Sequence, residues 1–341
     1  MRAVAYPAPA VRIFSGIQPT GRKHLGNYIG AIRGYLEGQE RADPAIYCIV
    51  DLHATSVAYD PKALPGYVLD TTAMLIAAGL DPERCILFRQ SDVREHSELT
   101  WLLSSVTPYG DLQRMTQFKD KSEREQQLVR TSLFLYPVLQ AADVLLYRTD
   151  EVPVGDDQRQ HIELAREIAR RFNSTYGEVL VEPEHVIPKI GARIMDLQDP
   201  SRKMSTSQGT DAARIYIDDE ADDIRRKFGR AETDSGREIV KGPDKPGISN
   251  LIDILAVTRG VTPEEVEREF DGEGYGAFKT AVAESVVELL GPVRERYAEL
   301  RPDEQALERA LADGAERARA IAQPLMAEVR GAMGIGPVGS A

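Results

Sequence analysis

Short runs of apolar, largely β-branched residues alternate with longer segments of helical periodicity in this chain, and no other feature of the sequence constrains the fold as much. The run AIYCIV at residues 45–50 is the most informative because every position in it is apolar. A strand that is apolar on both faces belongs inside a parallel sheet with helices on either side. The chain is therefore expected to be built from βαβ units.

The first ninety residues predict the order strand, helix, strand, helix, strand. The strands are expected at residues 11–17, 45–50 and 85–90, and the helices at residues 26–38 and 62–78. This order is typical of a doubly wound sheet. We therefore predict an α/β, Rossmann-like fold.

The rest of the chain predicts an insert, further α/β elements and then a helical region. Residues 92–127 are polar and helical, and from about residue 218 the strand signals stop while charge-rich helical segments continue. Between these two regions we expect a helix at 136–147, a short strand at 152–154, a helix at 157–172 and a strand at 188–197. The predicted domains are a flexible leader (1–11), a Rossmann-like domain (12–217) with a helical connecting insert (about 92–130), an all-helical domain (218–335) and a tail (336–341).

Composition excludes several classes of protein. The chain has 341 residues, and 42 Lys and Arg against 54 Asp and Glu give a net charge of −12. This acidic balance argues against broad nucleic-acid binding, although a local basic surface could still hold one particular RNA. No stretch approaches the roughly 18 apolar residues of a membrane helix, so no membrane association is expected.

The two cysteines indicate the compartment. Cys48 and Cys85 both lie within apolar runs. This placement is typical of core packing in a reducing cytoplasm and not of a disulfide framework. We therefore expect a cytoplasmic protein with two buried thiols.

Residues 16–27, GIQPTGRKHLGN, lie between the first predicted strand and the first predicted helix. The glycines in this segment allow a ligand to approach the backbone, and the start of a helix favours phosphate. His24 and Asn27 place two polar side chains on the opening turn of that helix. The segment predicts a nucleotide site, although the dinucleotide fingerprint G-x-G-x-x-G is absent. The alternative is that His24 and Asn27 only cap the helix.

A second polar segment, SRKMSTS at residues 201–207, carries Lys203. Such a loop taken alone is more often a solvated connection than a site. Together, however, H-x-G-N after the first strand and K-M-S-x-S late in the α/β part resemble the two signature motifs of class I aminoacyl-tRNA synthetases.

Within that class, residues from about 14 to about 333 resemble the bacterial tryptophanyl-tRNA synthetases. The matching segments are FSGIQPTG, IVDLHA, MTQFK, AADVLLY, VPVGDDQRQHIELAR, PKIGARIMDL, PGISN and GYGAFK. Tyrosyl enzymes share the fold, but their G-F-D-P-T and G-S-D-Q segments are replaced here by GIQPT at residues 16–20 and GDDQ at residues 155–158.

The resemblance implies a ligase that acts in two steps. Tryptophan and ATP would first give tryptophanyl-adenylate and pyrophosphate, and the amino acid would then pass to the 2′-hydroxyl of the terminal adenosine of tRNA(Trp). Mg²⁺ would enter with ATP, and no metal held by the protein itself is expected. The resemblance also implies a homodimer and a C-terminal domain that reads the anticodon, where the basic stretches at residues 224–228 and 294–301 could face the RNA.

The resemblance assigns an ATP site to both signature segments. His24, Gln18 and Lys203 are the expected catalytic residues, with Lys203 stabilising the charge on the phosphoryl group in transfer. The residues expected to contact ATP are Gln18, Pro19, Thr20, Gly26, Asn27, Gly155, Asp156, Asp157, Ile194, Lys203, Met204, Ser205, Thr206 and Ser207.

The amino-acid pocket is predicted around one helix. Tyr136, Gln140, Asp143 and Tyr147 are spaced 4, 3 and 4 residues apart, so they share one face of an otherwise apolar helix. The resemblance gives the carboxylate of Asp143 the indole N–H as its partner, and a helix that is only salt-bridged to its neighbours is the alternative. The other expected contacts of tryptophan are Phe14, Gly16, His53, Val152, Val154 and Gln158.

Two positions depart from the family pattern. Thr206 stands where a second lysine is usual, and Gln140 stands where many bacterial relatives have methionine. We hypothesise that these two residues reshape the site without changing its substrate and lower its affinity for tryptophan analogues. Because Tyr136, Gln140 and Asp143 are similar to a polar triplet of tyrosyl enzymes, tyrosine specificity remains an alternative. Two further alternative functions are a regulatory protein that binds tryptophan or RNA, and a nucleotidyltransferase.

The remaining polar and aromatic residues are interpreted as structural. Trp101 is expected in the core or at an interface. His96 and His185 lie in polar contexts without the spacing of metal ligands, and His161 is expected to cap or pack.

Overall fold

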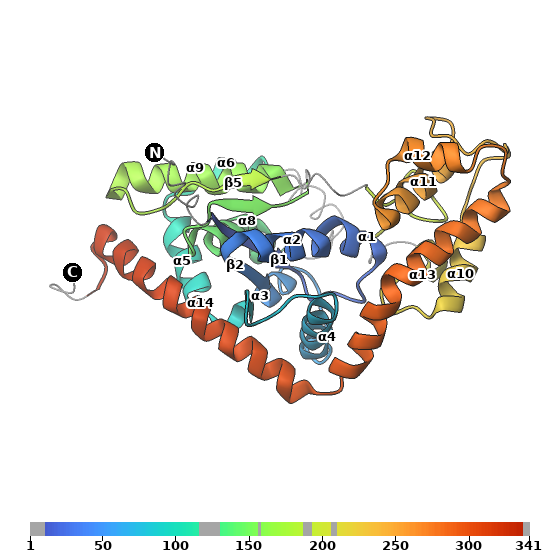
Figure 1. Ribbon diagram of the computed structural model, residues 1–341. Coiled ribbons are helices and arrows are strands. Elements are labelled where there is room, and N and C mark those ends of the chain that lie inside the picture. The colour runs from blue at the N-terminus through green and yellow to red at the C-terminus, as the bar shows by residue number, and fades with distance from the viewer. Residues whose placement is uncertain (1–10, 116–129, 156–157, 187–192, 206–209, 337–341) are drawn as a thin grey trace, which may run out of the picture.

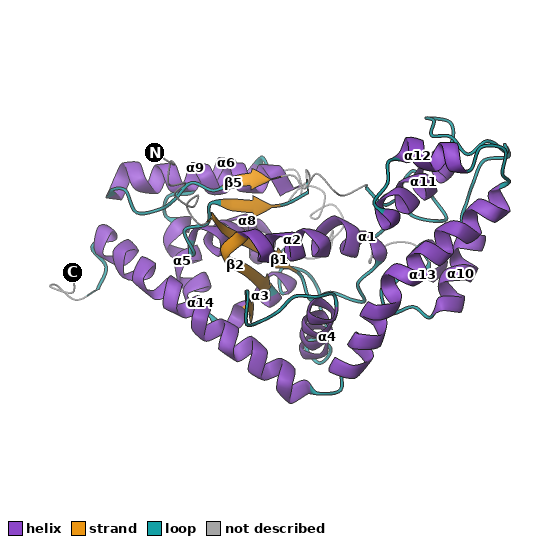
Figure 2. Ribbon diagram, viewed as in Figure 1, coloured by secondary structure: helices purple, strands orange, loops and turns teal. Residues whose placement is uncertain are grey.

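The computed structural model describes residues 11–115, 130–155, 158–186, 193–205 and 210–336. Five parallel strands form one sheet in the order β3-β2-β1-β4-β5 (Figures 1 and 2). The strands are β1 (Val11–Ile17), β2 (Ala42–Ile49), β3 (Ile86–Arg89), β4 (Glu151–Pro153) and β5 (Glu184–Val186). This topology confirms the predicted Rossmann-like α/β sheet.

Helices cover both faces of the sheet, and residues 45–49 of β2, the strand next to the central β1, are apolar and buried. Successive side chains of β2 point to opposite faces and enter two separate core clusters. Ala45, Tyr47 and Ile49 join one cluster, while Ile46 and Cys48 join the other.

The described helices of the α/β part begin after the first strand. Tyr28–Ile32 form one π-helical turn between α1 and α2. The helices are α1 (Leu25–Asn27), α2 (Arg33–Arg41), α3 (Asp51–Ala54), α4 (Leu64–Ala77), α5 (Glu95–Ser104), α6 (Tyr109–Gln113), α8 (Thr131–Leu145) and α9 (Arg159–Tyr176). None of the helices in the described ranges is long and apolar enough to cross a membrane.

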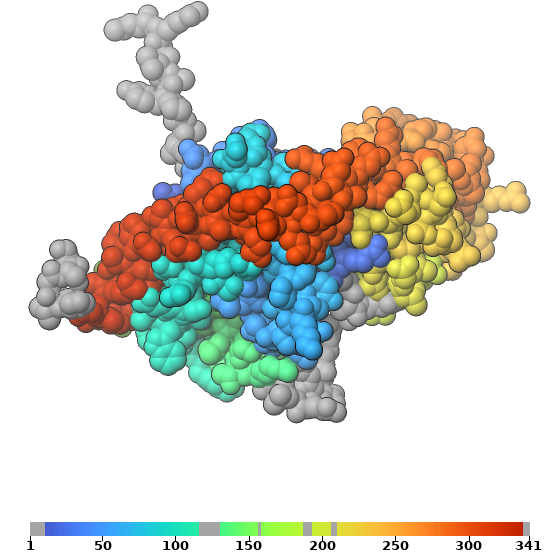
Figure 3. All heavy atoms as spheres, turned by 90° about the horizontal axis from the view of Figure 1, so that it is seen from below, coloured from blue at the N-terminus to red at the C-terminus, as the bar shows by residue number. Residues whose placement is uncertain are grey.

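The C-terminal region is helical, as predicted, but its last helix returns to the sheet. The helices are α10 (Ala221–Gly229), α11 (Pro246–Arg259), α12 (Pro263–Glu269), α13 (Tyr275–Leu300) and α14 (Glu304–Met333). Figure 1 shows α10, α11 and α12 grouped away from the sheet, while α13 runs from that group to α4, and Figure 3 shows α14 lying across one face of the molecule. The helix α14 packs on β3, an edge strand of the sheet.

A glycine permits this packing. A Cβ on Gly314 would lie 1.9 Å from the carbonyl oxygen of Leu87 in β3, so only glycine fits between the two backbones. Nearby, the guanidinium of Arg317 donates to the carbonyl oxygen of Cys85 over 2.9 Å. The helix thus covers a sheet edge that would otherwise be open.

Most predicted elements agree with the observed ones, and the fifth strand does not. We expected a strand at residues 188–197, but within its described part Met195 forms only an isolated bridge with Lys203. The sheet takes the three residues of β5 instead. They escaped notice because a short, partly exposed edge strand carries no run of apolar residues. The leader up to residue 10, the tail from 337 and residues 116–129 of the insert lie outside the described residues.

The structure tests the predictions for the two cysteines and for Trp101. Cys48 and Cys85 are buried free thiols, as expected. Trp101 is 78% exposed, so the expectation that it belongs to the core of this chain is wrong. Because Trp101 lies on an exposed face of α5, an interface with another molecule is the remaining interpretation of this residue.

Candidate active site

A cavity of about 430 Å³ opens at the carboxyl ends of the parallel strands. Its size is within the usual range of about 300–1,000 Å³ for small-molecule sites. All nine residues predicted to contact tryptophan line it, together with Gln18. The lining residues are Phe14, Ser15, Gly16, Gln18, Val50, His53, Tyr136, Gln140, Asp143, Val144, Val152, Val154 and Gln158.

The sheet topology places the cavity. The chain leaves β1 toward β2 and later returns on the opposite side of β1 at β4, so the order of strands reverses there. Loops diverge at such a switch point and leave a crevice. Gly16 in β1 allows the side chain of Val50 to pack closely on the strand, because a Cβ there would lie 3.0 Å from a methyl carbon of Val50.

Asp143 is the buried charge of the cavity, with 2% of its surface exposed. Its Oδ1 accepts hydrogen bonds from Nε2 of Gln90 and from Nδ1 of His96, each over 2.6 Å. Its Oδ2 lies 2.8 Å from Nε2 of His53. The backbone N–H of Leu52 in turn donates to Oε1 of Gln90 and orients that amide. The helix α8 thus presents a carboxylate held by neighbours from three other segments.

This arrangement keeps the carboxylate ionised and leaves it able to accept one further bond. Burial alone would raise the pKa of Asp143, but the hydrogen bonds from His53 and His96 outweigh it and hold the pKa well below its usual range. A carboxylate offers about four acceptor positions, and three are filled by protein donors. Because Asp143 lines the cavity, a ligand N–H can fill the fourth.

Tyr147 lies in the turn that follows α8, two residues beyond the end of the helix, and is fully buried outside the cavity. Its hydroxyl lies 2.7 Å from Nε2 of His96. Its ring stacks on Phe14, a wall of the cavity, with 5.6 Å between ring centroids. Of the four polar residues predicted to share one helical face, Tyr136, Gln140 and Asp143 line the cavity, while Tyr147 packs behind its wall.

The cavity wall also carries hydroxyl and amide groups. The hydroxyl of Tyr136 lies 3.0 Å from Nε2 of His161 on α9, so His161 supports a side chain of the cavity wall. The amide of Gln140 donates to Oε1 of Gln158 over 3.3 Å. The cavity thus combines one buried carboxylate with neutral hydrogen-bonding groups.

The first signature segment forms a reciprocal helix cap. The backbone N–H of His24 donates to Oδ1 of Asn27 over 3.0 Å, and the N–H of Asn27 donates to Nδ1 of His24 over 3.3 Å. These two residues therefore cap the helix, which leaves open whether they also bind a ligand. Burial, with the positive charges of Arg214 and Lys203, lowers the pKa of His24 to about 4. The imidazole is thus neutral at pH 7.

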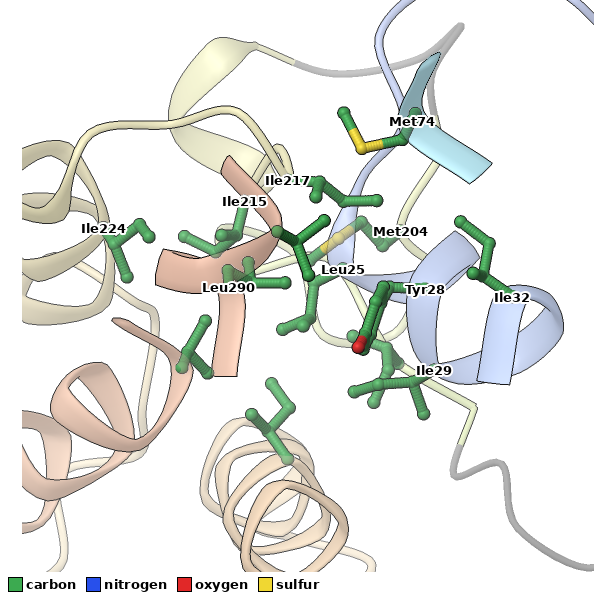
Figure 4. Close-up of a cluster of buried hydrophobic side chains, with 14 of the residues drawn as sticks. Leu25, Tyr28, Ile29, Ile32, Met74, Met204, Ile215, Ile217, Ile224 and Leu290 are labelled. Atoms are coloured by element: carbon green, nitrogen blue, oxygen red, sulfur yellow. The ribbon is translucent and has the colours of Figure 1, made fainter. Parts of the chain in front are cut away.

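The structure brings the second signature segment beside the first. Met204 is buried in the same hydrophobic cluster as Leu25 (Figure 4). A Cβ on Gly26 would lie 3.7 Å from Cβ of Ile194, so these predicted ATP contacts are neighbours. Lys203 is exposed and within electrostatic range of His24. The predicted contacts Asp156, Asp157, Thr206 and Ser207 lie outside the described residues.

The basic stretches of the helical region are engaged within the chain. Arg225 forms an ion pair with Glu284, and Lys227 is buried against Asp219. Arg301 pairs with Asp70. Arg225, Lys227 and Arg301 are thus paired within the chain, and the expectation that residues 224–228 and 294–301 face RNA stays a prediction.

Sequence reasoning missed several residues of the site. His96 lies in a polar stretch of the sequence that gives it no predicted role, yet it is fully buried against Asp143. Gln90 follows the third strand directly, and the rule that carboxyl ends of parallel strands meet at the site could have found it. Ser15, Val50 and Val144 also line the cavity. In the described part of the chain, no group of three His, Cys, Asp or Glu residues could hold a metal ion.

A parallel sheet, a cavity at its switch point and two signature segments beside it define an α/β nucleotide-binding fold of the synthetase type. Residues 7–291 match the family model described as tRNA synthetases class I (W and Y). The chain belongs to this family.

Individual relatives are named for tryptophan. The chain is 48% identical over 324 residues to the tryptophan–tRNA ligase of Wolinella succinogenes, covering 95% of this chain and 98% of the relative. The tryptophanyl-tRNA synthetase structure from Mycoplasma pneumoniae superposes with a TM-score of 0.87 at 34% identity, covering 96% of this chain and 98% of that one. The Campylobacter jejuni enzyme, complexed with ADP and tryptophan, gives a TM-score of 0.81 at 34% identity, with coverages of 95% and 100%.

Proposed function

We propose that the protein is a tryptophan–tRNA ligase that activates L-tryptophan with ATP and transfers it to tRNA(Trp). The observation that carries this function is the buried Asp143, whose three protein donors leave one acceptor position for a ligand in the cavity. Indole has a single N–H donor, which suits that position. Phenylalanine has no such donor and would leave the carboxylate partly unpaired.

The tryptophan would lie with its indole at Asp143 and its amino and carboxylate groups toward Tyr136, Gln140 and Gln158. These groups line the same cavity. Gln18, which lies at the end of β1, would stand where the substrate carboxylate meets the α-phosphorus of ATP. Holding the two reactants in this geometry supplies much of the rate enhancement.

ATP, bound with Mg²⁺ as MgATP, would occupy the region between the two signature segments. Support comes from the proximity of Gly26 to Ile194 and from the packing of Met204 on Leu25. Lys203 would neutralise the charge that grows on the phosphates, and an exposed cation that closes on the substrate favours the transition state. A neutral His24 would bind phosphate as a hydrogen-bond donor without adding charge.

Partners and compartment are part of the same proposal. We infer that residues 12–217 form the catalytic domain, on whose sheet α14 packs, and that the helical region of residues 218–335 recognises the tRNA anticodon, in a homodimer in the cytoplasm. The exposed Trp101 on α5 supports an interface between subunits. The two buried free thiols are compatible with a reducing compartment.

Pyrophosphate exchange tests the function. Purified protein with MgATP should exchange pyrophosphate with tryptophan and far more slowly with tyrosine or phenylalanine at equal concentration. Asp143→Asn replaces one acceptor oxygen by a donor, so its kcat/KM for tryptophan should fall by about a hundredfold or more. Exchange that prefers tyrosine would make Gln140 the decisive residue, and no exchange with any amino acid would favour a regulatory binding protein.

A further inference from the structure

Lys23 is a buried lysine to which neither signature motif gives a role. Only 6% of its surface is exposed. Its ammonium group donates to the carbonyl oxygen of Gln18 over 2.7 Å and to that of Thr20 over 3.3 Å. The side chain therefore curls back beneath the loop that connects β1 to α1.

The backbone of Lys23 is anchored independently of that loop. Its carbonyl oxygen accepts a hydrogen bond from the N–H of Ile217 over 2.9 Å. The preceding residue, Arg22, forms ion pairs with Asp218 and Asp219 at 2.9 and 3.0 Å. The backbone of Lys23 is thus held by the segment that leads into the helical region, and its ammonium group holds the loop.

The ammonium is charged at neutral pH despite its burial. Burial lowers the pKa of Lys23 to about 8, and the charge of Asp70 on α4 partly opposes this effect. Asp70 is itself bonded by Arg301 and, over 3.5 Å, by Tyr297. The direct hydrogen-bond acceptors of the lysine are therefore the two loop carbonyls rather than a carboxylate.

The two bonds orient the loop. Carbonyl oxygens carry partial negative charge, and those of Gln18 and Thr20 point toward the ammonium beneath them. A loop with its carbonyls turned inward presents less negative charge to an approaching anion. Gln18 also lines the cavity, so the loop adjoins the place where the amino acid would react.

We propose that Lys23 is a positioning residue for the triphosphate of ATP, acting through the carbonyl groups of Gln18 and Thr20. This inference rests on the ATP site proposed above. The lysine need not touch ATP, because its effect is to hold the loop and to keep positive charge beneath it. Its removal should weaken the binding of ATP more than that of tryptophan.

Steady-state exchange kinetics of Lys23→Met test this role. The KM for ATP should rise by about tenfold or more because two charge-assisted hydrogen bonds are lost, while the KM for tryptophan stays within about twofold. Lys23→Arg keeps the charge and the donors and should recover most of the loss. Lys62→Met removes an exposed lysine before α4 and should behave as the wild type.

Each possible result separates the hypotheses. Equal rises in both KM values, an unchanged KM for ATP, or an arginine variant no better than methionine would each overturn the role of Lys23. If Lys23→Met does not fold, Lys23→Gln is compared with Lys23→Arg under the same criteria. Wild-type protein without tryptophan-dependent exchange would instead contradict the proposed function itself.

Discussion

Asp143 is a charge placed where burial is unfavourable, and its partners explain how the fold tolerates it. An unpaired buried carboxylate costs several kcal/mol, whereas hydrogen bonds to a charged group contribute about 1.5–3 kcal/mol each. His96 is central among those partners because it also binds the hydroxyl of Tyr147. The imidazole thereby connects the carboxylate to the residue that stacks on Phe14.

His96 is expected to position Asp143 for tryptophan. In His96→Phe the Oδ1 oxygen loses one donor, and the KM for tryptophan in pyrophosphate exchange should rise by about tenfold or more. The KM for ATP should change little. His96→Asn retains a donor near the place of Nδ1 and should lie much closer to the wild type. If the phenylalanine and asparagine variants have the same KM for tryptophan, His96 has no such role.

The sequence revealed Asp143 but not its partners. The carboxylate was visible because it interrupts an apolar helix at helical spacing. His96 and Gln90 bond it from 47 and 53 residues away along the chain, and no periodicity spans such separations. Lys23 was likewise not predicted, because the segment at residue 217 that holds its backbone is distant in sequence.

At the scale of elements, α14 is positioned by a close approach of two backbones. The helix covers an edge of the sheet, and its side chains enter both core clusters, with Leu311 in one and Leu325 in the other. Gly314 marks the point of contact with β3. The helix is therefore part of the core of the α/β region although it follows the helical region in sequence.

Gly314→Ala should destabilise the protein. The added methyl group meets backbone atoms of Leu87, so the helix must shift, at a cost of about 1–3 kcal/mol in the free energy of unfolding. Gly331→Ala in the same helix meets no atom within 4 Å and should be neutral or up to about 1 kcal/mol more stable. Urea unfolding of both variants checks this, and equal stability would show that α14 does not pack closely on β3.

Sequence patterns predicted some of the strands and not others. The strands β1, β2 and β3 were predicted because each is an apolar run bounded by turn residues. The strand β5 has three partly or fully exposed residues, and only its pairing with β4 makes it a strand. The helical signal of α14 was visible, but nothing in it indicated which surface it would cover.

At the scale of the whole molecule, the exposed aromatic residues suggest an interface. Trp101 on α5 is 78% exposed and Tyr109 on α6 is 66% exposed. Tyrosine and tryptophan are enriched where subunits meet. In the proposed homodimer, these exposed aromatic residues would be buried between the two subunits.

Trp101→Glu is expected to shift the protein toward the monomer. A charge at a buried apolar contact disfavours association, so sedimentation velocity at micromolar concentration should show a larger monomer fraction than in the wild type. Tyr59→Glu places the same charge on a different exposed aromatic residue and should leave the oligomeric state unchanged. A wild-type protein that is monomeric, or a Trp101 variant that remains as dimeric as the wild type, would contradict this interface.

The sequence by itself determined the class of fold, the two signature segments and the side chains of the amino-acid cavity. The class of fold follows from local information, because strand and helix periodicities are short, whereas the signature segments and most of the cavity residues were assigned by the resemblance to known synthetases. The tertiary structure alone decided that His96 and Gln90 hold Asp143, that Lys23 lies beneath the loop at Gln18, and that α14 returns to the sheet. Each of these depends on contacts between distant segments, which form only when the whole chain is packed.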